Sequence, residues 1–352
     1  MKYKIEIWPI MKLVSLHYEK KLNLNPPYQR NAIWTIQSQK LLIDTVKKGL
    51  PLPTFFLQSV GDGYEMVDGQ QRTRAMLSYT QDDGFPDSNE IRHAAGEFDN
   101  YQIAVMTLDS NLSHEEVREF YVRVNRAGVK LERPELNKAE RFNTNFLKIT
   151  TSLAELVEFR ELKIFRSADV RRMFDRDFVE ELAALILYGP QDKKKIVDNI
   201  YKKDVTGDEG NQITSTFKRI LDKISVLNQK ILLSETRFTQ KNDFYTLFSL
   251  LINLEEINTD NLVQLYEVLV YISRGISPSN EESNTLREYA INCVTQSNSK
   301  RARQKRLEIL TSLLLNETNI MNEAQNDVAS YFNLPMELIK IDRFFTFNII
   351  DR

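Results

Sequence analysis

The spacing of apolar residues changes near residue 133, and this change limits the folds open to the chain. Before it, short segments that alternate polar and apolar residues, such as 1–8 and 101–108, are separated by stretches with helical spacing. After it, helical spacing continues from one segment to the next, at 169–188, 212–232, 241–254, 260–273, 284–316 and 322–333. The pattern predicts an α+β protein with a small mixed α/β domain at 1–145 and a larger all-helical domain at 146–352.

Composition agrees with two globular domains of mainly helical structure. The chain has 352 residues, and single cores rarely grow beyond roughly 250–300 residues. Its 11 glycines and 10 prolines are too few for an all-β protein with many tight turns. The apolar tail 344–350 is compatible either with a late strand or with a docked extension.

The most specific local pattern is YEMVDGQQRTRAML at 64–77. An apolar segment at 53–60, the turn Gly-Asp-Gly at 61–63 and the segment YEMVDG predict a hairpin. Helical spacing begins directly afterwards, at Gln70 or Gln71. The sequence therefore predicts a strand that passes into a helix through a very tight turn.

Such a turn has the properties of an anion site. The first N–H groups of a helix have no partner within the helix, and together with the helix dipole they attract negative charge. Arg72 and Arg74 add positive charge, and Asp68 could hold Mg²⁺ or orient a water molecule. The simpler alternative is a capping Asp68, a turn at Gly69 and arginines on a solvated helix face.

A second candidate is PPYQR at 26–30, followed by Trp34. The two prolines exclude regular helix and restrict the loop, while Tyr28 and Trp34 offer flat faces for stacking on a base. Gln29 can bind a base edge or a ribose, and Arg30 can reach a phosphate. The alternative is a loop whose aromatic residues pack against their own domain.

A third cluster is FYVRVNRAGVKLERPEL at 120–136. It ends a helix that the capping box of Ser113 and Glu116 predicts. Asn125, next to Arg126, is either a helix cap or a carboxamide ligand for a metal or phosphate.

In order and spacing, these motifs resemble the N-terminal domain of GmrSD-type restriction endonucleases, a family also catalogued as an uncharacterised domain family. That family is similar in turn to ParB nuclease-like and sulfiredoxin domains. The resemblance covers about residues 10–145, through PPYQR with its tryptophan, DGQQR, and RVNRAG with LxxxEL. It implies a ParB/sulfiredoxin-like first domain that binds and hydrolyses a nucleoside triphosphate.

The resemblance and the local chemistry together give a set of expected site residues. Asp68, Gln71 and Arg72 are expected to be catalytic, and Asp68 and Asn125 to hold Mg²⁺ that accompanies the nucleotide. The base of that nucleotide is not specified by the sequence. The residues expected to bind the nucleotide are Tyr28, Gln29, Arg30, Gly69, Gln70, Gln71, Arg72, Arg74, Asn125 and Arg126.

Many members of this family carry a C-terminal HNH nuclease domain, which uses histidines as general base and metal ligand. In this chain no histidine follows His114. Imidazole can fill neither role in the second half of the chain, so we expect a helical domain that is not an HNH nuclease.

The run KRARQKR at 300–306 has five positive charges in seven residues. The formal net charge of the whole chain is −2, so nucleic-acid contact would have to come from a local patch. We predict that this run meets the DNA backbone through Lys300, Arg301, Arg303, Lys305 and Arg306. The alternative is an ordinary solvated helix face.

The leading hypothesis is a protein that binds and hydrolyses a nucleoside triphosphate within a bacterial phage-defence or DNA-associated system. DNA and a separate nuclease or defence subunit are further partners that the sequence leaves open. One alternative is a non-catalytic DNA- or protein-binding module whose nucleotide site acts only as a switch. The other is a DNA nickase, ranked last because the DGQQR motif offers a single carboxylate.

We expect a cytoplasmic protein without a membrane partner. No apolar run reaches the ~20 residues that a membrane-spanning helix needs. The first residues, MKYKIEIWPI, lack the basic and then apolar pattern of a secretory signal.

Overall fold

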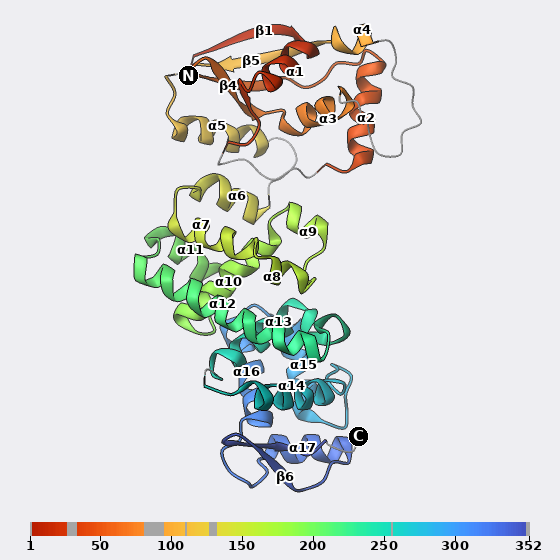
Figure 1. The fold of residues 1–352 in the computed structure, drawn as a ribbon, viewed down its shortest axis with the longest axis vertical. Coiled ribbons are helices and arrows are strands. Elements are labelled where there is room, and N and C mark those ends of the chain that lie inside the picture. The colour runs from red at the N-terminus through yellow and green to blue at the C-terminus, as the bar shows by residue number, and fades with distance from the viewer. Residues whose placement is uncertain are drawn as a thin grey trace. The chain divides into compact units, whose positions relative to one another are not determined.

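The chain divides into two compact units, the first mixed and the second mainly helical, which confirms the predicted α+β class (Figure 1). The computed structural model describes residues 2–26, 34–80, 95–109, 111–126, 132–254 and 256–349. The first unit consists of residues 1–142 with 171–173, and the second of residues 143–170 with 174–352. In the part of the chain so described, no helix combines the length and apolar character required to cross a membrane.

The first unit is built on a five-stranded sheet in the order β1-β5-β3-β4-β2. The pairs β1–β5 and β3–β4 are antiparallel, whereas β3–β5 and β2–β4 are parallel. Its elements in chain order are β1 (Tyr3–Pro9), α1 (Ile10–Tyr18), β2 (Leu22–Asn23), α2 (Ile36–Lys47), β3 (Phe55–Val60), β4 (Gly63–Asp68), α3 (Gln70–Thr80), α4 (Ala95–Asp99), β5 (Gln102–Leu108), α5 (His114–Arg126) and α6 (Arg133–Arg141).

The sequence pattern predicted the parts of this unit that surround the tight turn. The β3–β4 hairpin, the immediate start of α3 and the strand β5 are confirmed. Strand β2 was missed because two residues are too short to show an alternating pattern, and it is held by parallel pairing with β4.

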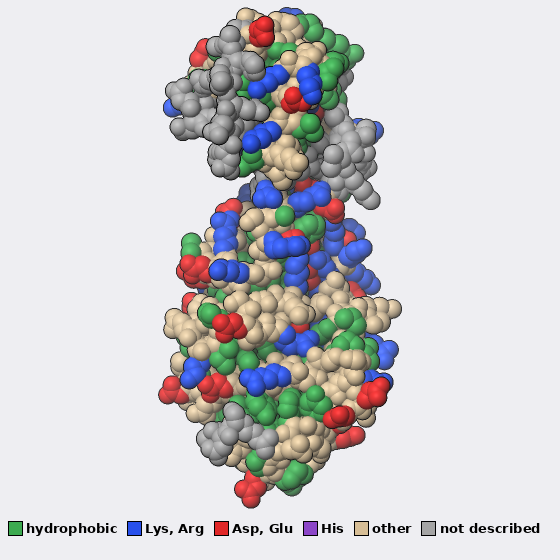
Figure 2. Space-filling model, turned by 90° about the vertical axis from the view of Figure 1, so that its right-hand side faces the viewer, with side chains coloured by type: hydrophobic (Ala, Val, Ile, Leu, Met, Phe, Trp, Pro, Cys, Tyr) green, Lys and Arg blue, Asp and Glu red, His purple; other side chains and the backbone are tan. Residues whose placement is uncertain are grey.

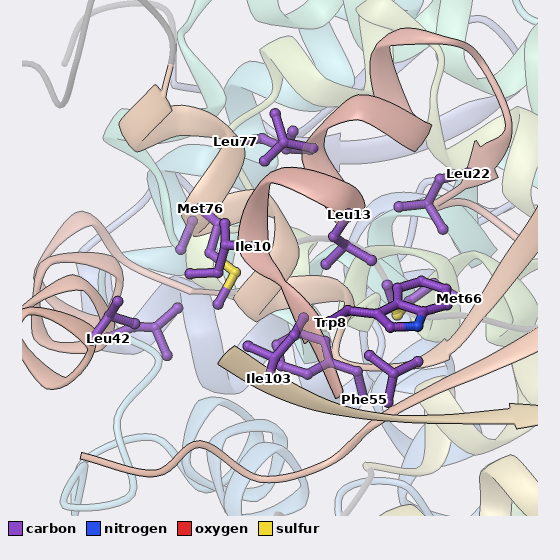
Figure 3. Packing of buried hydrophobic residues seen from close by; sticks show 14 of the residues in the cluster. Trp8, Ile10, Leu13, Leu22, Leu42, Phe55, Met66, Met76, Leu77 and Ile103 are labelled. Carbon is purple, nitrogen blue, oxygen red and sulfur yellow. The ribbon is translucent and has the colours of Figure 1, made fainter. Parts of the chain in front are cut away.

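The main core of the first unit lies on one face of the sheet. Trp8, Phe55 and Met66 from the strands meet side chains of α1, α2 and α3 there, as Figure 3 shows for Leu13, Leu42 and Met76 among others. Successive strand residues point to opposite faces, so the neighbours of these residues serve a second core. On that second face the cluster consists of Val67, Leu108, Val117, Tyr121 and Ala139, with α5 and α6 as its cover.

Residues 171–173 return to the first unit after the chain has entered the second. Arg172 forms an ion pair with the fully buried side chain of Glu135, with 2.9 Å between guanidinium nitrogen and carboxylate oxygen. The same carboxylate accepts the backbone N–H of Glu132 and so completes the capping box at the start of α6. The return segment therefore neutralises a buried charge of the first unit.

The second unit is a helical array that ends in a short hairpin. The hairpin corrects the prediction of an all-helical domain, and β7 shows that the apolar tail is a strand rather than a docked extension. The elements are α7 (Asn145–Ala154), α8 (Val157–Glu161), α9 (Ser167–Arg171), α10 (Phe174–Tyr188), α11 (Lys193–Lys203), α12 (Gly207–Lys230), the short 3₁₀ turns η1 (Leu233–Glu235) and η2 (Arg237–Thr239), α13 (Lys241–Ile252), α14 (Thr259–Ser273), α15 (Asn284–Val294), α16 (Lys300–Leu314), α17 (Glu323–Phe332), β6 (Leu338–Ile341) and β7 (Phe344–Phe347).

Helix α10 carries a buried network of charged side chains. Glu180 accepts hydrogen bonds from Arg176 at 3.2 Å and from the Tyr201 hydroxyl at 2.5 Å. Lys193 lies 2.6 Å from Asp177 and 2.5 Å from Glu181. Burial raises the pKa of Glu180, so the network holds this carboxylate in a position where its charge is costly without partners.

Candidate functional site

The turn between β4 and α3 consists of one residue, Gly69. Its φ of +106° lies in the left-handed region, which favours glycine. A Cβ at this position would also stand 2.5 Å from Cδ1 of Phe55. Both the backbone conformation and the close approach therefore require glycine, and they bring the first N–H groups of α3 directly to the end of the strand at Asp68.

Replacing Gly69 by alanine is expected to destabilise the first unit by about 2–4 kcal/mol, because backbone strain and overpacking against Phe55 add together. Both tryptophans of the chain, Trp8 and Trp34, lie in this unit, so the fluorescence change on urea unfolding reports on it alone. Gly61→Ala is the matched control, because φ is +58° there and a Cβ would meet no atom within 4 Å. Equal losses for the two variants would contradict the importance of the contact with Phe55.

Gln70 and Gln71 each bind a residue on one side of the PPYQR motif in the sequence. The side-chain amide of Gln70 donates to the carbonyl of Leu24. The side-chain oxygen of Gln71 accepts the backbone N–H of Trp34 at 3.3 Å. Leu24 and Trp34, which stand on either side of residues 27–33 in the sequence, are thus both bound to the first turn of α3.

The predicted residues Tyr28, Gln29 and Arg30 lie outside the described residues, whereas Trp34 is described. Trp34 is half-buried and packs against the main core of the first unit, in agreement with the alternative given for it above. The contact of Leu24 was not foreseeable, since a backbone carbonyl leaves no sequence signal.

Arg72 is turned into the protein. Its guanidinium donates to the carbonyls of Pro53 and Thr54, lies 4.3 Å from the ring centre of Phe55 and contacts Asp68 at 2.8 Å. Burial lowers the pKa of Arg72, and the Asp68 carboxylate opposes that effect. Both terminal nitrogens of the guanidinium donate within the domain, so Arg72 orients Asp68, and its expected contact with the nucleotide stays a prediction.

Asp68 lies at the end of β4 with about a third of its side chain exposed (32%). One carboxylate oxygen accepts from Arg72, which leaves the other oxygen for a ligand or water molecule. Among the described residues, no three Asp, Glu, His or Cys side chains group together as a metal site. A metal cage made only of these residues does not fit, but Mg²⁺ on a nucleotide keeps waters and phosphate oxygens and needs only one or two carboxylates.

Arg74, two residues after Arg72, forms no ion pair among the described residues. One terminal nitrogen donates to the side-chain oxygen of Asn25, while Nε is buried and has no hydrogen-bond partner in the same part of the chain. Burial lowers the pKa of Arg74. Asn25, which sequence reasoning missed, therefore fixes the Arg74 guanidinium at a described residue two positions before the segment 27–33 in the sequence.

Asn125 and Arg126 form the last turn of α5, and their side chains lie outside what the structure describes. The capping box at the start of this helix is confirmed. The Ser113 hydroxyl accepts the N–H of Glu116 at 3.3 Å, and the Glu116 carboxylate accepts the N–H of Ser113 at 2.9 Å. The predicted roles of Asn125 and Arg126 remain predictions.

The basic run at 300–306 begins α16, whose N-cap Ser299 separates it from α15 and divides the predicted segment 284–316. Lys300 and Arg301 are exposed. Lys305 lies 3.3 Å from Glu288 in a partly exposed ion pair. On the face shown in Figure 2, basic side chains are interspersed with acidic and uncharged ones.

Arg303 and Arg306, however, are buried. Arg303 is 3% exposed, pairs with Glu181 and lies over the ring of Tyr245 at 4.1 Å. Arg306 is fully buried and donates to the hydroxyl of Thr246 at 3.0 Å. The prediction that all five basic residues form a DNA-binding surface is therefore wrong, because two of them are parts of the core.

Residues 12–99 match the family model described as GmrSD restriction endonuclease, N-terminal domain. The match contains the turn at Gly69 and the segment 27–33, and it ends before Asn125. No curated protein and no solved structure matches the chain. The segment 12–99, which contains the turn between β4 and α3, is thus similar to the N-terminal domain of GmrSD restriction endonucleases.

Proposed function

We propose that the first unit binds a nucleoside triphosphate at the start of α3 and that the chain hydrolyses it within a restriction-like phage-defence system. One observation carries the proposal. Gln70 and Gln71 bind Leu24 and Trp34, so the PPYQR motif stands, in the sequence, between two residues that contact the first turn of α3. The family match over 12–99 supports the restriction-like context.

In this proposal, phosphate oxygens meet the backbone N–H groups of residues 69–72 and the guanidinium of Arg74. Arg72 is a positioning residue, because it fixes one oxygen of Asp68 at 2.8 Å and leaves the other oxygen for an attacking water. Asp68 would be the protein ligand of a Mg²⁺ that arrives with the nucleotide. When bound, such an ion neutralises charge that develops on the phosphates.

Arg74→Ala is expected to weaken nucleotide binding by about 1.5–3 kcal/mol, the usual value for a hydrogen bond to a charged group. Isothermal titration of the full chain with ATP, GTP, CTP and UTP in the presence of Mg²⁺ measures the effect. Lys48→Ala, which removes one positive charge from the exposed ion pair with Asp44, is the control for net charge. Equal affinity of wild type and Arg74→Ala would remove Arg74 from the phosphate site.

Phosphate release by the purified chain, with and without DNA, tests hydrolysis. Binding without release would favour the nucleotide-switch alternative, for which the structure offers one specific argument. Asp68 is the carboxylate of the motif, and it is already engaged by Arg72. Absence of binding for all four nucleotides would overturn both versions of the proposal.

A further inference from the structure

Among the described residues, strand β1 forms an edge of the five-stranded sheet and pairs with β5 alone. The N–H of Asp109 donates to the carbonyl of Lys2, and the N–H of Ile10 donates to the carbonyl of Tyr101. Hydrogen-bonded residues alternate along an antiparallel pair, so the even-numbered residues of β1 bond to β5. The N–H and C=O groups of Tyr3, Ile5 and Ile7 therefore point to the open edge.

The side chains of the same three residues form an exposed apolar stripe. Tyr3, Ile5 and Ile7 are 59%, 60% and 62% exposed. Residues directly opposite in an antiparallel pair share a face, so the half-buried Met106 and Ala104 continue the stripe on β5. This part of the sheet face is apolar. Among the described residues, it lies outside the hydrophobic cluster that α5 and α6 cover.

The opposite face of β1 carries one charge of each sign at its exposed positions. Lys4 and Glu6 form an exposed ion pair of 2.9 Å along the strand. They stand one residue before and one residue after Ile5. A two-fold axis at Ile5 that places two copies of the strand antiparallel therefore brings Lys4 of each copy opposite Glu6 of the other.

We propose that β1 is a self-association edge, which pairs antiparallel with β1 of a second copy about a two-fold axis at Ile5. In this register, Ile5 faces its own equivalent as a hydrogen-bonded pair, and Tyr3 faces Ile7 of the partner subunit in the same way. Lys4 lies opposite Glu6 of the partner subunit, and Glu6 opposite Lys4 of the partner subunit. This one register pairs the open backbone N–H and C=O groups, places the apolar side chains side by side and brings opposite charges together.

The strand lacks most of the devices that usually prevent edge pairing. Natural edges are blunted by short strands, bulges, prolines or uncompensated charge. β1 has seven residues and pairs with β5 without a register shift, and Pro9 stands at its last position. The charge of Lys4 is neutralised by Glu6 two residues later. In the antiparallel register, these two charges also lie opposite the two charges of the second copy. A two-fold interface between identical patches is the commonest way in which soluble chains associate.

Charge exchange tests the proposal on the full chain by sedimentation velocity and light scattering. Lys4→Glu and Glu6→Lys each place like charges opposite each other in two cross-strand pairs, so each should weaken association by about tenfold or more. The double variant with both exchanges restores opposite charges and should associate like wild type. A mixture of the two single variants should form heterodimers in preference to either homodimer. Lys4 is exposed, whereas Glu6 is 31% exposed and interacts with Lys12 and Trp8 as well, so far-UV circular dichroism of each variant is compared with wild type to check the fold.

A second measurement locates the interface. Amide exchange at Ile5 should slow as the protein concentration rises, whereas Lys4 and Glu6, which already bond to β5, should change little. Ile5→Lys should abolish association, while Ile320→Lys, at an exposed position of the second unit, should not. A wild-type chain that stays monomeric up to about 100 µM would overturn the proposal, because a functional dimer of this kind needs micromolar affinity. Association of equal strength in wild type and in both single charge-exchange variants would also overturn the proposal.

Discussion

Replacing Arg306 by alanine is expected to destabilise the second unit by about 3–5 kcal/mol, a large part of the roughly 5–15 kcal/mol by which folded units are usually stable. The side chain is fully buried, and it donates to the Thr246 hydroxyl and to the carbonyls of Asn292 and Ser297 at 2.6 and 3.0 Å. Truncation leaves these acceptors unsatisfied and opens a cavity the size of an arginine.

The loss should appear in thermal unfolding followed by far-UV circular dichroism, since the second unit contributes most of the helices. Arg303→Ala should have a similar effect, because it opens a cavity and leaves the buried carboxylate of Glu181 with Lys193 as its remaining ion-pair partner among the described residues. Arg301→Ala is the matched control: it removes an exposed arginine from the same helix and should change stability by less than about 0.5 kcal/mol. If all three variants melted alike, the burial of Arg303 and Arg306 would not matter for stability.

This result decides how DNA binding can be tested. Neutralising all five basic residues at 300–306 would unfold the second unit, so loss of DNA binding by that variant would carry no information. Lys300, Arg301 and the partly exposed Lys305 can be removed without entering the core.

Asp68→Asn is expected to reduce nucleotide turnover by at least about 100-fold while leaving nucleotide affinity within a few-fold of wild type. The amide keeps an oxygen for Arg72 but cannot accept a proton from an attacking water. Phosphate release gives the rate, and titration calorimetry gives the affinity. This expectation rests on the proposed hydrolysis and fails together with it.

Asp62→Asn provides the matched control for this variant. It makes the same chemical change in the turn before β4, away from α3, and should keep wild-type turnover. Wild-type turnover in Asp68→Asn would exclude Asp68 from the reaction. Loss of both turnover and the fluorescence of a folded first unit would instead show that the contact with Arg72 is needed for folding.

The tight turn was predictable from sequence because its determinants are local. A strand pattern, one glycine and an immediate helical pattern at 64–77 leave little freedom, and the structure places them as expected. The direction of Arg72 was not predictable. Its partners are the carbonyls of Pro53 and Thr54, and backbone acceptors are available at every position of a sequence.

The basic run on α16 shows a signal that could have been used. The apolar residues Ile309, Leu310 and Leu313 define the buried stripe of this helix. Counting back along the same stripe by three or four residues reaches Arg306 and then Arg303. The helical periodicity therefore predicts that Arg303 and Arg306 are buried, whereas their charge predicts that they are exposed. The acid that settles the matter for Arg303, Glu181, is too distant in sequence to be recognised as its partner.

The return of residues 171–173 to the first unit has a consequence for protein synthesis. The chain leaves the ribosome in sequence order, so Glu135 precedes Arg172 by 37 positions, which take a few seconds to add. During that interval a carboxylate that is fully buried in the finished protein lacks its ion pair with Arg172. A chain cut after residue 142 would never form this ion pair, whereas a chain cut after 173 keeps both partners. The first unit is therefore contiguous in space but not in the order in which it is made.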